Sequence, residues 1–375
     1  MSYYLLVLGL FIIVGLLILL YHFLKAPKEP FEAFKGEQPL DSRDAPPPVA
    51  APQKMLFKKE IEYKLARCKK FDLSKHKMRS PQELSPQQQK IIYQELKNFV
   101  LPSAVGTRLA ALLRDPNASA REIAQLIATD PLLSARLLAI VNSAYFRQPE
   151  GKKIHSIHQA ILLLGFNQVR NLVFHSFLEN TLKGKLPLPT EEVKKIWIHS
   201  ATVASVAGFL AKQINRASGL AVTAGLLHDI GKFFLPLFDM GNEGSISLQE
   251  DTENLPPFVE EEIKYGFNHC VIGGFLSQLW KLPEEMTKII LYHHLGLREH
   301  LQRLNKEVQE AIILVILADN ICHILGAAEE EAYIYTLPPE TLQILNLPKQ
   351  WETFITPELK KEVDKTIYML NEFYR

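Results

Sequence analysis

A histidine and an aspartate stand side by side in an otherwise apolar stretch of the chain. They are His228 and Asp229, within the run AGLLHDIGK at 224–232. An ionised carboxylate that is taken out of water is costly unless a cation or a set of hydrogen bonds meets it. Because imidazole and carboxylate are both ligands of divalent metals, the pair indicates a metal site.

Further side chains of metal-ligand type are spread over the second half of the chain, each in a helix-like segment. Imidazole and carboxylate ligands suit Fe, Mn, Zn or a similar divalent ion, and open positions on such an ion can polarise a phosphate and activate water. This is the chemistry of phosphoester hydrolysis. Lys232, three residues after Asp229, could direct a positive charge toward a bound phosphate as a weak catalytic candidate. The metal-ligand candidates are His199, His228, Asp229, His269, His293, His294 and Asp319.

Asp319 follows the apolar run at 311–318, so the sequence predicts a buried carboxylate that needs a cation. A second interpretation requires no metal, because the aspartates and histidines could form a structural network of hydrogen bonds and ion pairs. His293 and His294 would point about 100° apart on a helix. Both can serve only if two metals, or a metal and a substrate, share the site.

The composition predicts a globular protein with reduced thiols. The chain has 375 residues, 47% of them hydrophobic, which is enough for a well-buried core. Its three cysteines are an odd number without a CxxC pair, and a buried free cysteine is ordinarily a small apolar residue, so Cys270 and Cys322 receive no ligand role. The formal net charge of +1 gives no reason to expect a nucleic-acid partner.

The N-terminus has the composition of a membrane span. Residues 3–24 carry no formal charge and are long enough to cross a hydrocarbon core of about 30 Å as a helix. A cleaved signal peptide is the competing interpretation, but no basic residue precedes the apolar run and no small-residue cleavage site follows it. Lys25, Lys28 and Lys35 all follow the span, which predicts a single-pass protein of the cell (inner) membrane with a cytoplasmic C-terminal domain.

The rest of the chain divides into a linker and a helical body. Residues 26–55 are rich in proline, and the mixed basic and apolar segment at 54–80 is interpreted as a solvated connector, with a lipid-contacting amphipathic helix as the alternative. From Pro86 onward, capping signals such as Ser156 and Asp130-Pro131 precede apolar residues at steps of three and four. The predicted fold class is therefore all-α, a compact helical bundle.

The order of the candidate ligands resembles the H…HD…D pattern of the HD superfamily of metal-dependent phosphohydrolases, with His199, His228-Asp229 and Asp319 in the matching positions. Over about 95–325 the chain also resembles the HDOD domain, the HD-related output domain of bacterial signalling proteins. The motifs that carry this resemblance are LP at 101–102, DPLLSARLL at 130–138, NSAYF at 142–146, SI at 156–157, AILLLG at 160–165, GFNH at 266–269, LPEE at 282–285 and YHH at 292–294.

The resemblance implies an all-α domain in which a helical N-terminal subdomain lies beside an HD-like subdomain. Many HDOD domains lack part of the HD metal set and act as signalling modules without hydrolase activity. This chain keeps every candidate ligand, which is similar to HD-GYP cyclic-di-GMP phosphodiesterases, although no Gly-Tyr-Pro segment follows His293-His294. The predicted segments are a transmembrane anchor at 1–25, a linker and connector at 26–85, the N-terminal HDOD subdomain at 86–190, the HD-like subdomain at 191–325 and a C-terminal helical extension at 326–375.

Two functions follow as hypotheses. The first is a membrane-tethered HDOD signal-transduction module with a divalent-metal site, which acts by binding a signalling protein partner or a nucleotide. The second is an active metal-dependent phosphohydrolase or phosphodiesterase of the HD type, in which His199, His228, Asp229 and Asp319 hold one ion. The sequence leaves homo-oligomerisation open. Convergence of the ligand side chains on one point is the geometry that the metal interpretation requires.

Overall fold

Helices dominate the computed structural model wherever it describes the chain. The described residues are 51–73, 76, 78–99, 123, 127, 131–146, 153–182, 184–185, 188–217, 219–239, 255–294, 303–326 and 333–374. The predicted membrane span at 3–24 lies outside them. Within them the only strands form one two-stranded sheet, so the predicted all-α fold class is confirmed.

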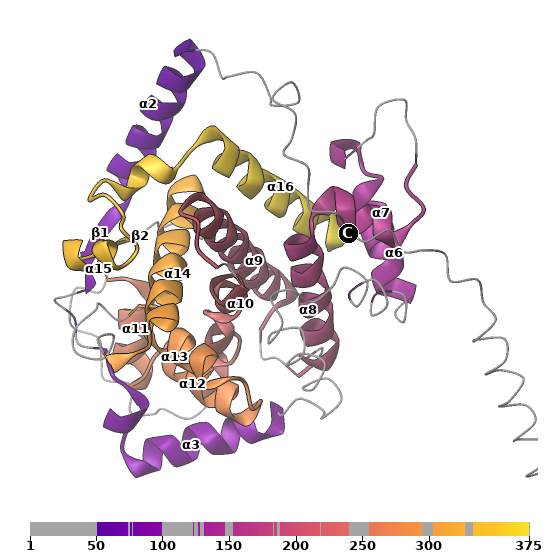
Figure 1. The fold of residues 1–375 in the computed structure, drawn as a ribbon. Coiled ribbons are helices and arrows are strands. Elements are labelled where there is room, and N and C mark those ends of the chain that lie inside the picture. Colours follow the sequence, from indigo (N-terminus) through magenta and orange to yellow (C-terminus); the bar gives the residue numbers. More distant parts are fainter. Residues whose placement is uncertain are drawn as a thin grey trace, which may run out of the picture. The chain divides into compact units, whose positions relative to one another are not determined.

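Figure 1 shows the elements in chain order. The α-helices are α2 (Ala51–Arg67), α3 (Pro86–Leu96), α6 (Pro131–Val141), α7 (Ile157–Leu164), α8 (Phe166–Leu182), α9 (Thr190–Gln213), α10 (Gly219–Leu227), α11 (Pro257–Tyr265), α12 (His269–Leu279), α13 (Glu284–Tyr292), α14 (Lys306–Leu325), α15 (Pro339–Ile344) and α16 (Pro357–Phe373). The 3-10 helices are η2 (Pro81–Glu83), η3 (Lys97–Phe99), η4 (Ala144–Phe146), η6 (Ile230–Phe233), η7 (Leu235–Phe238) and η9 (Trp351–Phe354). The strands are β1 (Lys69–Asp72) and β2 (Tyr333–Thr336).

The centre of the fold is the buried helix α14, which packs against α9 and α10 (Figure 1). The Asn305 side chain caps its first turn by accepting a hydrogen bond from the Val308 amide at 2.9 Å, and Gly326 ends it at a φ of 78°. This helix and the segment Gly219–Phe238 are long and apolar enough to cross a membrane. Since 83% and 78% of their apolar windows are buried inside the protein, they are core helices here.

The predicted helix starts are largely correct. Helix α6 begins at Pro131, as the preference for proline at the first helical position predicts, and α13 begins at Glu284, with Pro283 as its N-cap. Helix α7 also begins after Ser156, but the Ser156 side chain makes no capping hydrogen bond. The capping-box pattern therefore locates this helix start correctly and predicts its hydrogen bonding wrongly.

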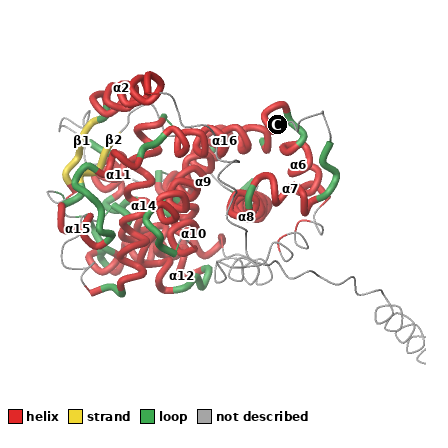
Figure 2. The backbone as a smooth tube through the Cα atoms, turned by 45° about the horizontal axis from the view of Figure 1, so that its top comes forward, coloured by secondary structure: helices red, strands yellow, loops and turns green. Residues whose placement is uncertain are grey.

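The predicted connector contains regular structure. After α2, the strand β1 pairs in parallel with β2, with Lys69 opposite Tyr333 and Asp72 opposite Thr336. Figure 2 shows this pair as the yellow strands among red helices. Because each strand has only four residues and its partner lies more than 250 positions away, no alternating pattern marks it in the sequence.

The C-terminal helix α16 joins two groups of helices, because it packs on both α9 and α6 (Figure 2). A buried polar junction fixes it to α8 and α9. The Gln168 amide nitrogen lies 2.7 Å from Ser205 Oγ and 2.8 Å from Glu362 Oε1, and donates to Thr366 Oγ1 at 2.9 Å. The residues after 326 thus take part in the folded body.

One side chain of α14 holds strand β2 in place. The Asn320 amide donates to the Tyr335 carbonyl oxygen at 2.9 Å, and its Oδ1 accepts from the Tyr335 amide at 2.8 Å. Asn320 is 0% exposed, so no solvent replaces these bonds if they are lost. This pair positions the Tyr335 ring beside the histidines described below.

We expect Asn320→Ala to lower the free energy of unfolding of the full chain by about 2–4 kcal/mol, because it leaves a buried amide and a buried carbonyl of Tyr335 without a partner. Urea unfolding in detergent measures the change. Gln343→Ala, at an exposed position of α15, is the control and should shift the free energy by no more than about 0.5 kcal/mol. Equal effects of the two substitutions would show that Asn320 does not anchor β2.

Candidate metal centre

All seven candidate ligands lie in one buried cluster. His199 comes from α9, His228-Asp229 from the end of α10, His269 from the start of α12, His293-His294 from the end of α13, and Asp319 from α14. None of these residues is more than 8% exposed. Positions far apart in the sequence therefore converge, as the metal interpretation requires, and their role as ligands stays a prediction.

Asp229 stands at the centre of the cluster, and its two carboxylate oxygens face different histidines. Oδ2 lies 3.3 Å from His228 Nε2 and 3.5 Å from His199 Nε2. Oδ1 lies 3.2 Å from His269 Nε2 and 3.7 Å from His293 Nε2. Two ligand atoms on one tetrahedral ion are about 3.3 Å apart when each bond is about 2.0–2.1 Å. The cluster thus divides into two ligand sets that share Asp229.

The first set is completed by Asp319. Its Oδ1 lies 3.1 Å from His199 Nε2, and the three residues His199, His228 and Asp229 present ligand atoms within 4.8 Å of one another. His323, one turn further along α14, adds an Nε2 atom 3.4 Å from Asp319 Oδ1. These side chains match the four residues predicted for one ion and add a histidine.

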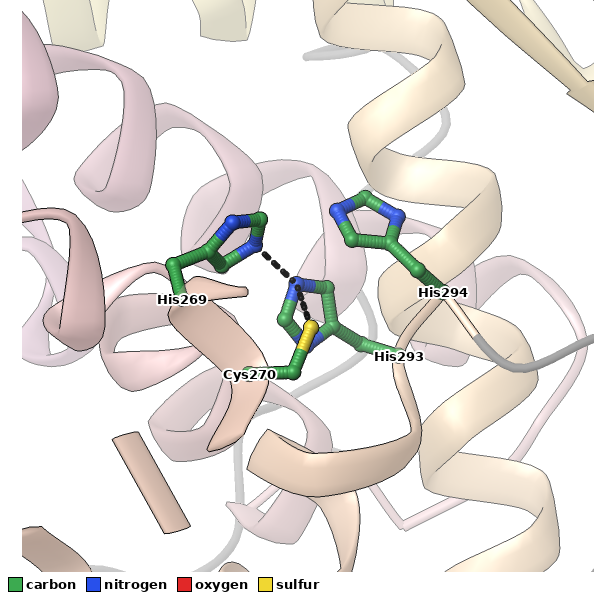
Figure 3. Close-up of side chains that lie close together, drawn as sticks. All are labelled: His269, Cys270, His293 and His294. Carbon is green, nitrogen blue, oxygen red and sulfur yellow. Dashed lines mark hydrogen bonds between the residues drawn. The ribbon is translucent and has the colours of Figure 1, made fainter. Parts of the chain in front are cut away.

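The second set lies on the other side of Asp229 and is shown in Figure 3. His269, Cys270, His293 and His294 are all buried and present ligand atoms within 4.8 Å of one another. His269 Nε2 and His293 Nε2 face each other at 3.3 Å. The His294 ring stacks on Phe258 with centroids 4.7 Å apart, which fixes its orientation.

Three of the histidines turn Nε2 toward the centre of the cluster and place Nδ1 beside an oxygen atom. Each uses its Nδ1–H as a donor to an oxygen, so in the neutral ring the lone pair is on Nε2. Such second hydrogen bonds are typical of metal-binding histidines. The pairs are His228 with Gly225 O at 2.7 Å, His293 with Ile290 O at 2.8 Å, and His269 with Glu261 Oε2 at 2.6 Å.

These residues fit a divalent cation. The facing lone pairs of His269 and His293 repel unless a proton or a metal ion lies near them. Asp229 Oδ1, Asp319 Oδ1 and His228 Nε2 are buried and make no hydrogen bond. Buried polar atoms of this kind are rare without a partner, and a cation at each ligand set would satisfy them.

The electrostatics keep both aspartates ionised. Burial alone raises the pKa of Asp229, but His228 and Lys232 outweigh it and hold that pKa well below its usual range. Burial likewise raises the pKa of Asp319, and the neighbouring His323 and His199 reverse the effect and lower it well below the usual range. Two buried carboxylates are thus available as anionic ligands.

Lys232 lies at the edge of the cluster. Its Nζ donates a hydrogen bond to Asp229 Oδ2 at 2.8 Å, and its side chain is 28% exposed. In this position the ammonium compensates the buried carboxylate, and its predicted action on a phosphate stays a prediction. Between the two residues, Gly231 allows η6 to approach α12, because a Cβ there would overlap the carbonyl oxygen of His269.

Sequence reasoning missed three side chains of the site. His323 follows Asp319 by four residues, a spacing that places both on one helix face and could have been noticed. Glu261 gives no local signal, because it is one of three consecutive glutamates at 260–262. Cys270 was set aside as an apolar filler, but it lies between the histidines. Burial raises its pKa, while His293 and His269 outweigh burial and lower the pKa to about 7.

The all-α body and its buried His–Asp cluster define a protein domain of the HD type. The HDOD domain family matches residues 100–295, more than half of the chain. The chain belongs to this family, which confirms the predicted resemblance.

Solved structures agree on the fold. An HDOD domain protein of unknown function from Geobacter sulfurreducens is 25% identical, with a TM-score of 0.53 over 75% of this chain and 99% of that one. A provisionally assigned signal transduction protein from Marinobacter aquaeolei VT8 is 21% identical, with a TM-score of 0.55 over 86% of this chain and 67% of that one. A provisionally assigned phosphohydrolase from Shewanella amazonensis SB2B is 18% identical, with a TM-score of 0.51 over 75% of this chain and 97% of that one.

Curated relatives match a smaller part. Ribonuclease Y from Mesoplasma florum is 30% identical over 120 residues, 32% of this chain and 22% of that protein. Ribonuclease Y 1 from Pediococcus pentosaceus is 26% identical over 202 residues, which are 53% of this chain and 31% of that protein. The chain spans less than a third of the length of these relatives.

We expect Glu261→Gln to weaken divalent-metal affinity roughly tenfold, because it removes the charge that orients His269 and makes it more basic. Competition with a chelator of known affinity measures the change in the full chain. Glu260→Gln, at an exposed position of the same helix, should leave the affinity within about twofold of the unsubstituted protein. Unchanged affinity in Glu261→Gln would exclude a supporting role for this carboxylate.

Metal binding should release protons and strengthen as pH rises. Burial lowers the pKa of His293, but Cys270 and Asp229 outweigh it and raise the pKa to about 9. Burial also lowers the pKa of His269, but the neighbouring Glu261 carboxylate outweighs burial and raises that pKa well above its usual value. Without metal these rings therefore hold an extra proton at neutral pH, which a metal ion must displace.

Calorimetric titration of the full chain in buffers of different ionisation enthalpy should show net proton release near pH 7. The apparent affinity should rise between about pH 6 and about pH 9 and then level off. The raised pKa of His293 also means that protonation stabilises the metal-free protein fully below the ordinary histidine pKa of about 6.5, and that this contribution is lost progressively as pH rises to about 9. Affinity that does not vary with pH would contradict histidine ligation.

Proposed function

We propose that this protein is a membrane-tethered HDOD signal-transduction module whose HD-like half holds a divalent metal. The observation that carries the proposal is the convergence of imidazole Nε2 atoms and the Asp319 carboxylate around Asp229. The apolar residues 3–24 are the proposed tether, with the body on the cytoplasmic side. Output would come from binding a signalling protein partner or a nucleotide.

The enclosed cluster supports a regulatory role. Its ligand residues are at most 8% exposed, and closed metal sites are typical of structural ions, whereas catalytic sites keep an open position. The ligands come from α9, α10, α12, α13 and α14, so an ion joins the ends of most central helices. Metal occupancy would therefore set the packing of these helices and of the surface they present to a partner.

A second candidate is a metal-dependent phosphohydrolase or phosphodiesterase. It is favoured by the two ligand sets that share Asp229 and by the similarity to ribonuclease Y, whose name denotes cleavage of RNA. Bound divalent ions would polarise a phosphate oxygen and lower the pKa of a water molecule. Asp229 would hold the ions, and the partly exposed Lys232 ammonium would stabilise negative charge on the phosphate.

Metal content tests the shared part of both functions. We expect the purified full chain to retain at least about one divalent ion and Asp229→Ala to lose it, because the substitution removes the carboxylate that joins the two ligand sets. Elemental analysis measures the content. Asp239→Ala, which removes a surface carboxylate paired with Lys264, is the control and should keep the metal. A metal-free full chain that binds no added Mn, Fe or Zn would overturn the metal site.

Turnover separates the two functions. The metal-loaded full chain is incubated with nucleotides, cyclic dinucleotides and short RNA oligonucleotides. If none is cleaved, the module function stands and the hydrolase is excluded for these substrates. Cleavage that is lost in Asp229→Ala and kept in Asp239→Ala would instead establish the hydrolase.

A further inference from the structure

Cys270 lies inside the second ligand set although nothing in the sequence pattern gives it a ligand role. The residue is 1% exposed, and its Sγ lies 3.9 Å from both Nδ1 and Nε2 of His293. Figure 3 shows the sulfur directed at the His293 ring, with His269 on the neighbouring position of the same helix. The thiol thus faces imidazole nitrogen atoms.

The separations in this set are close to those around one metal ion. Two nitrogens on a tetrahedral ion are about 3.3 Å apart, and a nitrogen and a thiolate sulfur are about 3.5 Å apart. His269 Nε2 and His293 Nε2 are 3.3 Å apart, and the sulfur is 3.9 Å from His293 Nε2. Because the sulfur is equally far from both nitrogens of the His293 ring, it would have to move by about 1 Å relative to that ring, by rotation of the Cys270 side chain, to bond an ion at His293 Nε2.

An independent observation points to the same place. Asp229 Oδ1 is buried, lies 3.2 Å from His269 Nε2, and makes no hydrogen bond. It is directed toward the two imidazoles and supplies a fourth ligand atom. One sulfur, this oxygen and two of the three imidazoles in the set would complete the four positions of a tetrahedral site, with His294 as the remaining imidazole.

The backbone around Cys270 favours a negatively charged sulfur. Cys270 is the second residue of α12, and its amide donates to Asn268 Oδ1 at 2.9 Å. A thiolate in the first turn of a helix is stabilised by the positive end of the helix dipole. Cys322 is equally buried, on α14, but belongs to no group of converging ligand atoms in the part of the chain that the structure describes.

We propose that Cys270 binds the second metal ion through its thiolate, together with His269, His293 and Asp229. The thiol proton leaves to solvent as the metal–sulfur bond forms. This inference rests on the proposed metal site and deepens it by naming the class of ion. A thiolate favours Zn²⁺ or Fe²⁺ over the harder Mn²⁺ and Mg²⁺.

Cobalt is the probe for the test, because Co²⁺ reports both the site and the sulfur. The full chain is stripped of metal and loaded with Co²⁺, and its absorption is recorded for the unsubstituted protein, Cys270→Ser and Cys322→Ser. We expect visible d–d bands in all three proteins. A near-ultraviolet sulfur-to-cobalt charge-transfer band should appear in the unsubstituted protein and Cys322→Ser, and should be lost in Cys270→Ser.

The possible outcomes separate the two proposals. If d–d bands appear without a charge-transfer band in the unsubstituted protein, the metal site stands and the thiolate ligand is excluded. If Cys322→Ser loses the charge-transfer band and Cys270→Ser keeps it, the assignment to Cys270 is overturned. If no Co²⁺ binds at all, the metal site itself fails.

A second measurement does not depend on the folding of a variant. X-ray absorption of the zinc-loaded unsubstituted protein should show sulfur at about 2.3 Å from zinc, and only nitrogen and oxygen neighbours would overturn the proposal. In Cys270→Ser that retains its metal, zinc affinity should fall at least about tenfold, since loss of an outer partner alone costs that much. Manganese affinity should change less than about twofold, and an equal loss for both ions would exclude a specific thiolate ligand.

Discussion

The structure depends on one buried carboxylate. Asp229 is 1% exposed and remains ionised because cationic groups surround it, and its two oxygens face separate sets of imidazoles. An uncompensated charge at this depth would cost several kcal/mol, so the helix ends that supply its partners must meet there. The short 3-10 helix after Asp229 and the close approach of Gly231 to the His269 carbonyl oxygen both bring the helix ends to this point.

The layer around the cluster links it to the N-terminal side of the folded body. Phe71 of β1 contacts the Phe258 ring edge-on at 5.7 Å, and Phe258 stacks on His294. Arg79 donates its amide to Glu262 Oε1 at 2.9 Å, one residue after the carboxylate that orients His269. Phe71 and Arg79 are therefore packed against α11, and Phe71 reaches His294 of the cluster through the Phe258 ring.

The sequence was sufficient where local chemistry repeats a strong pattern. Proline before acidic residues located α13, and the apolar run before Asp319 predicted a buried carboxylate. It was insufficient where a contact joins distant residues. Strand β1 has no periodicity of its own and exists because β2 lies beside it, and Glu261 takes its role only from the position of His269. The sequence gives Cys270 no ligand role because burial of a thiol is common, and only the imidazole nitrogens around it in the structure set this thiol apart.

A network of hydrogen bonds without metal is the strongest rival explanation of the cluster, and it leaves a specific problem. In the neutral rings of three histidines, Nδ1–H donates to an oxygen atom at the edge of the cluster, so Nε2 is a hydrogen-bond acceptor. These Nε2 atoms then face other acceptors; the histidines are His228, His269 and His293. Extra protons on the rings remove this conflict, and the raised pKa values of His269 and His293 show where they would sit. The same ring nitrogens would accept a metal ion in place of these protons. The proposed metal site therefore has a metal-free alternative in which protons, rather than an ion, occupy these nitrogens.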